Sequence, residues 1–179
     1  MAFEPQVVST EALVTTPVFD VERLCLHDGG RAFTREVVRH RGAVAVLAVD
    51  GDDVVLVRQW RAPLARAILE IPAGTRDVEG EALESTARRE LEEEAGLHAS
   101  TLEVLCEVWN SPGWSDQRTV IFLATGLTEV PRRPSGPEEE AIDVVRVALR
   151  DVVAMVASSE TMDASTAVAV LAYAARGAR

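Results

Sequence analysis

Residues 74–97 read GTRDVEGEALESTARRELEEEAGL, and this segment decides the fold. It opens as a loop rich in glycine and acidic residues and then predicts a helix over residues 82–95. Leu83, Ala87 and Leu91 recur every four residues along that helix, so they form a stripe that faces a core. Gly96 follows directly, and glycine is well suited to ending a helix.

Three carboxylates share one face of this predicted helix. Glu90, Glu93 and Glu94 lie within one turn of each other, and like charges at that spacing repel. Hard oxygen ligands in a cluster suit Mg²⁺ or Mn²⁺. Arg89 lies four residues before Glu93 and can orient it, and a backbone carbonyl near Ala73 would add one more oxygen. The alternative is an acidic face that is only solvated, and the acids alone favour it.

The composition limits what the chain can bind. Its 179 residues, of which 47% are hydrophobic, are enough for one domain with a real core. The formal net charge of -11 argues against nucleic acid and against anionic membrane surfaces, because both are bound by basic patches. An acidic protein that binds a polyanionic small molecule needs cations between the two. The net charge therefore agrees with the metal hypothesis.

The cysteines and the N-terminal segment indicate a cytoplasmic protein. Cys25 and Cys106 are too few for a disulfide framework or a metal cluster, and each lies in an apolar run that predicts a small buried side chain. The first residues lack the basic and apolar parts of a secretion signal. No apolar run approaches the roughly 20 residues of a membrane span. We therefore expect neither a membrane nor a nucleic-acid partner.

The remaining pattern is typical of a mixed sheet between helices, an α/β or α+β fold. Residues 1–41 predict antiparallel strands and are thin in apolar residues for a free-standing domain. We expect them to form an arm that packs on the rest or on a partner subunit, and residues 42–179 to form the main domain. Strands are predicted at residues 7–14, 18–27, 33–39, 42–49, 54–60, 68–72, 102–108, 119–125 and 144–149, an exposed loop at 132–140, and further helices at 151–158 and 164–176.

Residues 81–97 resemble the Nudix box, whose pattern is G-x5-E-x7-R-E-U-x-E-E-x-G-U, where U is aliphatic. Every position of the pattern from the first glutamate onward is matched, including Gly96, and a motif of this length is specific. One departure precedes the helix. The standard spacing places the first glycine at Thr75, whereas this chain has it at Gly74. A loop one residue longer accounts for the shift. It leaves the helix ligands in place, and only the identity of the loop carbonyl that would bind the metal stays undecided.

The Nudix resemblance implies an α/β/α sandwich that hydrolyses nucleoside diphosphates linked to another group, with two or three Mg²⁺ ions and Mn²⁺ as an alternative. Arg89 falls on the orienting arginine of the box, and Glu81, with Gly74 and Gly96, falls on a structural position. Glu93 either joins the metal ligands or acts through water. The metal-binding positions of the box correspond here to Ala73 through its carbonyl, Glu90, Glu93 and Glu94.

Two further segments resemble the ADP-ribose pyrophosphatases of that family. Residues 111–116, SPGWSD, are similar to a segment whose proline marks this group, which assigns Pro112 and Gly113 to substrate binding; Gln117 departs from the usual glutamate. RQWR, followed by LEIPAG, resembles a second such segment and places Arg61 on the diphosphate. The alternative for this arginine is a surface residue at a strand end.

The family's catalytic base comes from an acidic loop ahead of a late strand, and residues 137–144, PEEEAIDV, resemble it. The resemblance matches Glu138 and Glu140, and we favour Glu140 as the group that accepts a proton from water. The alternative is a solvated acidic loop without a catalytic role.

The resemblance thus implies Mg²⁺-dependent hydrolysis of ADP-ribose to AMP and ribose 5-phosphate. One alternative is a Nudix hydrolase of a nucleotide sugar, a dinucleoside polyphosphate, NADH or coenzyme A; another is a non-catalytic ADP-ribose sensor. The resemblance also implies a homodimer with exchanged N-terminal strands whose aromatic residues stack on adenine. Phe19 and Phe33 occupy similar places, and packing inside the hairpin is the alternative that we favour for both.

Overall fold

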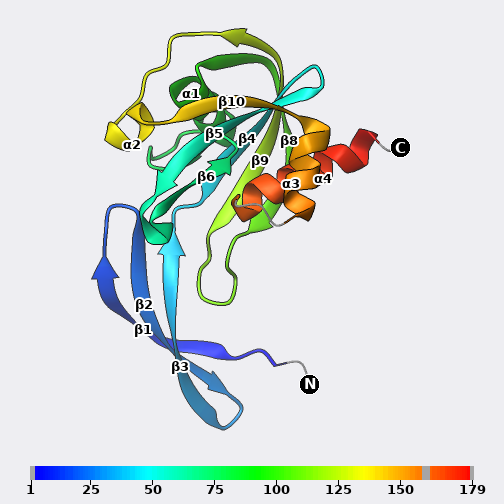
Figure 1. Ribbon diagram of the computed structural model, residues 1–179. Coiled ribbons are helices and arrows are strands. Elements are labelled where there is room, and N and C mark those ends of the chain that lie inside the picture. The colour runs from blue at the N-terminus through cyan, green and yellow to red at the C-terminus, as the bar shows by residue number, and fades with distance from the viewer. Residues whose placement is uncertain (1–2, 159–161, 178–179) are drawn as a thin grey trace. The chain divides into compact units, whose positions relative to one another are not determined.

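A computed structural model describes residues 3–158 and 162–177 (Figure 1). The chain divides into two compact units. Unit 1 comprises Met1–Gly42 and Trp109–Arg118, and unit 2 comprises Ala43–Val108 and Thr119–Arg179. Unit 1 therefore joins the N-terminal segment to a turn that lies much later in the chain.

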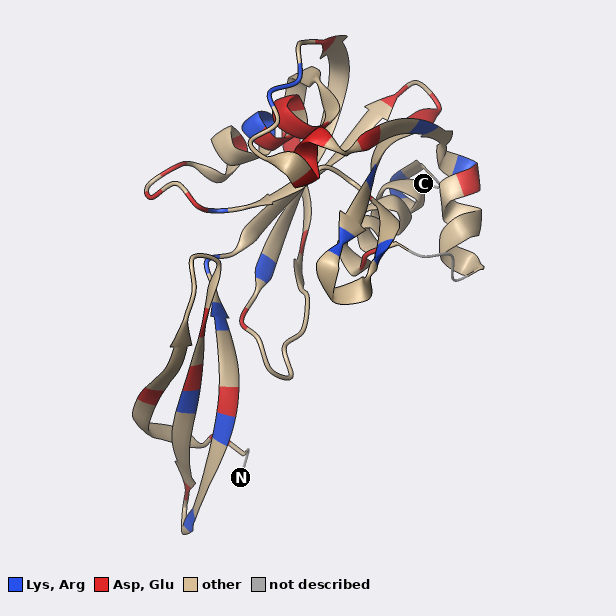
Figure 2. Ribbon diagram, turned by 60° about the vertical axis from the view of Figure 1, so that its left-hand side comes forward, with Lys and Arg blue, Asp and Glu red and all other residues tan. Residues whose placement is uncertain are grey.

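Unit 1 is built on three antiparallel strands in the order β1-β2-β3. They are β1 (Gln6–Thr15), β2 (Phe19–Asp28) and β3 (Arg31–His40). Every residue of β1 is exposed, and Leu24 is the one buried hydrophobic residue in the described part of this unit. Arg23 forms ion pairs with Glu11 and Glu36, and Figure 2 shows acidic and basic bands along these strands. A small sheet with so little buried apolar surface is marginally stable by itself.

The turn at residues 110–117 belongs to unit 1 because its backbone bonds to β3. The Val38 N–H donates to the Trp114 carbonyl (2.8 Å), and the Asp116 N–H donates to the Val38 carbonyl (3.2 Å). The Asp116 carboxylate accepts hydrogen bonds from the His40 N–H (2.8 Å) and from the Arg39 guanidinium (3.1 Å). The segment that contains Pro112 is thus anchored to the end of β3.

Unit 2 contains a seven-stranded mixed sheet. Its strands are β4 (Ala43–Asp50), β5 (Asp53–Arg61), β6 (Arg66–Glu70), β7 (Ala73–Thr75), β8 (Leu97–Trp109), β9 (Arg118–Glu129) and β10 (Asp143–Ala148). The main order is β10-β5-β4-β9-β8, with β6 beside β5 and β7 beside β4. Strand β4 runs parallel to β9 and antiparallel to β5 and β7, so the predicted mixed sheet is confirmed.

Helices cover both faces of this sheet (Figure 1). Helix α1 (Leu83–Ala95) buries Leu91 against one face, together with Val46. Helices α3 (Leu149–Ala157) and α4 (Ala164–Gly177) cover the other face, where Val170 packs in the same core as Leu47. Successive residues of a strand point to opposite faces, so β4 supplies both cores. The α/β/α sandwich is therefore confirmed.

The structure corrects the sequence predictions at three places. The sequence predicts a loop throughout residues 132–140, whereas α2 (Pro137–Glu140) is a short helix that begins with a proline, a residue suited to the first helical turn. Cys25 and Cys106 are free thiols but only half-buried. Phe19 is 39% exposed and is therefore not a core residue of the hairpin. Within the described part of the chain, no helix is long and apolar enough to cross a membrane.

Candidate active site

Residues of the predicted box hold both ends of α1. At its start, the Thr86 hydroxyl donates a hydrogen bond to the Glu81 carboxylate (2.8 Å). At its end, Gly96 takes a left-handed conformation with φ of 66°, and its N–H donates to the Glu92 carbonyl (3.1 Å). Glu81 and Gly96 thus place the carboxylates between them in a defined helical register.

Glu90 and Glu94 are buried on the inner face of α1, where they are only 6% and 4% exposed. The Ala73 N–H donates to the Glu94 carboxylate (2.9 Å). Burial raises the pKa of Glu94 to about 8 against that hydrogen bond, and the charges of Glu90 and Glu139 add to the increase. Burial also raises the pKa of Glu90 to about 7. Two neighbouring buried carboxylates are costly unless protons or cations neutralise them.

Gly74 lies directly against the Glu90 carboxyl group. It pairs with Val44 across β7 and β4, and a Cβ atom on it would overlap the carboxyl carbon and oxygens of Glu90. This position therefore requires glycine. The additional residue of the box lies between β7 and α1, so it does not displace Ala73 from Glu94. The Ala73 N–H still contacts Glu94 despite the departure at Thr75, and the role of the loop carbonyl as a ligand stays a prediction.

Arg89 connects the carboxylates of this region. Its Nη1 lies 2.8 Å from both Glu90 and Glu93. Its Nη2 lies 3.2 Å from Asp77 and 3.5 Å from Glu81. The guanidinium thus gathers four acidic residues, and it orients Glu93 as the spacing of four residues predicts.

The donor set fits a divalent cation. Within residues 3–158 and 162–177, no three His, Cys, Asp or Glu side chains converge as a complete metal site. Nevertheless, the buried Glu94 carboxylate lies beside the backbone of Ala73 and the buried Glu90 carboxylate beside that of Gly74, and hard oxygen donors of this kind are what Mg²⁺ and Mn²⁺ prefer. Glycine at position 74 leaves the space that the Glu90 carboxyl group occupies. These residues would hold such an ion.

Arg61 forms an ion pair with Glu70, and its charge acts on Glu94. Its Nε donates to both Glu70 carboxylate oxygens (3.1 and 2.9 Å), and its Nη2 lies 2.6 Å from one of them. Burial raises the pKa of Glu70, although the charge of Arg61 opposes this. The charge of Arg61 also opposes the rise in the pKa of Glu94, so the guanidinium acts on a carboxylate of α1. Sequence reasoning missed Glu70, although this residue lies within the LEIPAG segment.

The acidic turn at α2 contains one half-buried glutamate that sequence reasoning passed over. Glu138 and Glu140 are exposed, whereas Glu139 is half-buried. The charge of Glu139 raises the pKa of both buried carboxylates of α1. Its own carboxylate accepts hydrogen bonds from the N–H and the hydroxyl of Ser135, both at 2.6 Å. Glu139 therefore joins the two predicted residues as a candidate base.

Comparison with known proteins identifies the family. The NUDIX domain family profile matches residues 38–166. The chain belongs to the Nudix family. This Nudix protein is 41% identical over 172 residues to an ADP-ribose pyrophosphatase of Bacillus subtilis (strain 168), and the alignment covers 94% of this chain and 92% of that protein. It is 35% identical over 174 residues to a methanol dehydrogenase activator of Bacillus methanolicus, covering 94% and 91%.

The Nudix protein also shares its fold with a solved crystal structure of an ADP compounds hydrolase. The TM-score is 0.81 at 22% sequence identity, and the match covers 97% of this chain and 94% of that chain. This similarity confirms the mixed α/β architecture that the sequence predicts.

The remaining predicted substrate contacts of this Nudix protein lie in unit 1, whereas α1, α2 and Arg61 lie in unit 2. They are Phe19, Phe33, Pro112 and Gly113. The Phe33 ring stacks on the Phe3 ring with centroids 6.1 Å apart, and the Arg35 guanidinium lies 5.0 Å from the Phe33 centroid. Pro112 and Gly113 are exposed in their turn. Their role toward substrate stays a prediction.

Proposed function

We propose that this Nudix protein hydrolyses the diphosphate bond of ADP-ribose and releases AMP and ribose 5-phosphate. The observation that carries the proposal is its 41% identity, along nearly the whole chain, to an ADP-ribose pyrophosphatase. The buried pair Glu90 and Glu94 supports it, because an anionic diphosphate approaches such a pair only with cations between them. Arg61, whose charge acts on Glu94, adds a guanidinium, the group best shaped for phosphate oxygens.

The α1 residues prepare the site for a metal ion and the diphosphate. A divalent ion, when bound, would neutralise the diphosphate charge and acidify a water molecule. Glu90 and Glu94, with the Ala73 carbonyl, would hold that ion, and Arg89 keeps Glu93 on the same side of the helix. Arg61 uses its Nε and Nη2 for Glu70, which fixes the guanidinium plane and directs the remaining donors to the substrate.

A carboxylate of the α2 turn completes the reaction as a proton acceptor. The water oxygen forms a bond to one phosphorus, the bond from that phosphorus to the bridging oxygen breaks, and the water proton passes to the carboxylate. The family resemblance favours Glu140 over Glu138 for this step. The half-buried position of Glu139 and the two hydrogen bonds from Ser135 that hold its carboxylate favour Glu139 instead. Substitution of each separates these assignments.

The proposal extends to the finer predictions from the sequence. It includes Mg²⁺ as the metal, two or three ions per site, a cytoplasmic location, and a homodimer that exchanges the strands of residues 1–41. The fully exposed β1 strand supports the dimer. A lone three-stranded sheet buries little apolar surface, and a partner subunit would cover this strand. Sedimentation equilibrium of the full chain measures its oligomeric state, and a monomer at micromolar concentration would contradict the dimer.

The test is a substrate panel with the purified full chain. ADP-ribose, a nucleotide sugar, a dinucleoside polyphosphate, NADH and coenzyme A are incubated with and without Mg²⁺, and phosphate is quantified after phosphatase treatment of the products. We expect Mg²⁺-dependent hydrolysis with the highest kcat/KM for ADP-ribose, by about tenfold or more, since one well-placed group in a site typically gives that discrimination.

Two results of the panel would overturn the proposal. A higher kcat/KM for another compound would identify that compound, and not ADP-ribose, as the preferred substrate. Tight binding of ADP-ribose without hydrolysis would indicate a sensor. Mn²⁺ in place of Mg²⁺ tests the choice of metal. Chromatographic detection of AMP identifies the bond that breaks.

A further inference from the structure

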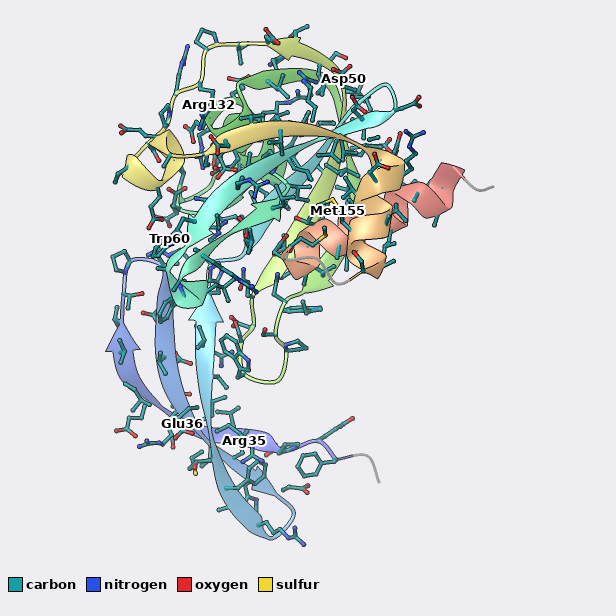
Figure 3. The ribbon with its side chains drawn as sticks, in the orientation of Figure 1. Arg35, Glu36, Asp50, Trp60, Arg132 and Met155 are labelled. Carbon is teal, nitrogen blue, oxygen red and sulfur yellow. The ribbon has the colours of Figure 1, made fainter. Side chains whose placement is uncertain are left out.

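Arg132 links α1 to the acidic turn by bonding to backbone carbonyls. Its Nη2 donates to the Glu139 carbonyl (2.7 Å), its Nη1 to the Ile142 carbonyl (3.1 Å), and its Nε to the Glu93 carbonyl (3.4 Å). Figure 3 labels Arg132 on the segment between β9 and α2. One side chain therefore contacts the last turn of α1, the end of α2 and the residue that leads into β10.

The contact with α1 is of a kind that helix ends need. The last carbonyls of a helix lack partners within it and carry partial negative charge. Helix α1 has no basic residue in its own last turn, so Arg132 supplies positive charge from another segment. The side chain also lies against Gly96, where an added Cβ would approach the Arg132 Cγ to 2.8 Å. The glycine that ends α1 thus also makes room for the arginine.

The α2 turn has little else in its own sequence to hold its position. The helix is four residues long and none of its residues is buried, so apolar packing contributes little to it. The hydrogen bonds from Ser135 to Glu139 are internal to the segment. Ile142 is buried just beyond it, and Arg132 bonds to that residue as well. Arg132 therefore bonds both to Glu139 within the helix and to the buried residue Ile142 that follows it.

We propose that Arg132 is a positioning residue that sets the distance between the α1 carboxylates and the proton-accepting carboxylate of α2. Its catalytic consequence rests on the proposed function. A planar guanidinium with five donors reaches three carbonyls at fixed angles, whereas an ammonium group is a single centre with three donors. Lysine at this position keeps the charge and loses the geometry.

The experiment compares Arg132→Ala and Arg132→Lys with Arg133→Ala in the full chain. Arg133 is the adjacent arginine and is exposed, so it provides a matched control. We expect Arg132→Ala to lower kcat for ADP-ribose about 10- to 100-fold, because small misplacements of catalytic groups have effects of this size. KM changes less than about threefold, because no substrate contact is removed. Arg132→Lys loses activity to a smaller extent, and Arg133→Ala matches the wild type.

Amide hydrogen exchange measures the position of the turn independently of activity. We expect faster exchange at Glu140 and Ile142 in Arg132→Ala, since the N–H groups of these two residues bond within the turn. Exchange in the central α1 residues stays at the wild-type rate. Added guanidinium ion is expected to restore part of kcat in Arg132→Ala and to leave Arg133→Ala unchanged.

Three results would overturn the inference. They are wild-type kcat in Arg132→Ala, unchanged exchange in the turn, and a kcat loss that disappears once activity is normalised to the folded fraction. If the wild type hydrolyses no member of the substrate panel, the proposed function fails, and the exchange measurement alone then decides whether Arg132 holds the turn.

Discussion

The tetrapeptide Glu-Glu-Glu-Ala occurs twice in this chain, at residues 92–95 near the end of α1 and at residues 138–141 around α2. In the first copy, the third glutamate is Glu94, which is 4% exposed. In the second copy, the third glutamate is Glu140, which is exposed. Identical residues in helical conformation thus occupy opposite environments.

The difference arises from what each helix packs against. Helix α1 has thirteen residues, and Ala87 and Leu91 fix one of its faces against the sheet, which forces Glu94 inward. Helix α2 has four residues and no buried residue of its own. Burial raises the pKa of a carboxyl group, so that the charged form needs a nearby cation to be stable. An exposed carboxylate stays charged and accessible to water. The comparison shows that the residues packed around each acidic run, and not the run itself, determine whether its glutamates can serve as metal ligands or as water-accessible carboxylates.

The sharpest way to break this comparison is to neutralise the buried copy. We expect Glu94→Gln to lower kcat/KM for ADP-ribose by more than about 100-fold, because residues around a metal commonly contribute that much and this one would be a direct ligand. Glu92→Gln on the same helix is the control, since its side chain is half-exposed and pairs with His98. Circular dichroism confirms that both variants fold. Wild-type-like turnover in Glu94→Gln would remove the metal assignment.

Neutralising the second copy residue by residue sharpens the comparison. Among Glu138→Gln, Glu139→Gln and Glu140→Gln, we expect Glu139→Gln to lower kcat most, by about 100-fold, as is typical for loss of a general base. Glu139 is the half-buried glutamate of α2, and Ser135 holds its carboxylate with two hydrogen bonds. Steady-state kinetics with saturating Mg²⁺ measures the effect. A larger loss in Glu140→Gln would instead support the assignment that the family resemblance favours.

Stability as a function of pH tests whether the first copy is buried in solution. The pKa values of Glu90 and Glu94 rise from 4.5 to about 7 and about 8, so the folded state keeps protons that the unfolded chain has already lost. Their contribution to stability is therefore full below about pH 4.5 and disappears as the pH rises through about 8. Each pKa unit corresponds to about 1.4 kcal/mol.

We thus expect the metal-free Tm to fall from about pH 5 to about pH 9, and added Mg²⁺ to raise Tm more at the higher pH. Scanning calorimetry in a chelating buffer measures the first effect. Glu94→Gln should flatten the dependence, because it removes the group with the larger shift. A Tm of the wild type that does not change over this range would contradict the burial of the pair.

The smallest expected effect comes from truncating the exposed copy. We expect Glu140→Ala to change the free energy of unfolding by less than about 0.5 kcal/mol, as is usual for surface positions. Urea denaturation measures this value, and Glu138→Ala serves as a second exposed position. A loss of several kcal/mol in either variant would show that these exposed side chains contribute to the stability of the folded protein.

Local features of the site were predictable, and contacts with the backbone were not. Residues 81–97 predict α1, its apolar stripe and its terminal glycine, because each depends on neighbours a few positions away. The acceptors of Arg132 are backbone carbonyls, which leave no residue pattern for a sequence to display. The sequence alone did not indicate a role for Glu70, because its ion pair with Arg61 joins β5 to β6 and depends on how the side chains lie in the folded sheet.

The same distinction explains the remaining differences. A four-residue helix such as α2 is too short to show a helical period, so its segment resembles a loop. Gly74 was identified by the box, but its contact with Glu90 depends on how β7 meets α1. The predicted roles of Pro112 and Phe33 concern unit 1 and stay predictions.

The parallel pairing of β4 with β9 has a consequence for the order in which the molecule forms. Residues 43–48 pair with residues 119–124, and β5 to β8 together with α1 lie between them in the chain. Pairings between distant segments form slowly, because closing a long loop costs entropy before contacts offset it. A nascent chain that ends before β9 contains every residue of the 81–97 motif but lacks a central strand of the sheet on which α1 packs. If α1 holds a metal ion as proposed, metal affinity should therefore emerge only after β9 has left the ribosome, which would make it a reporter of the pairing between β4 and β9.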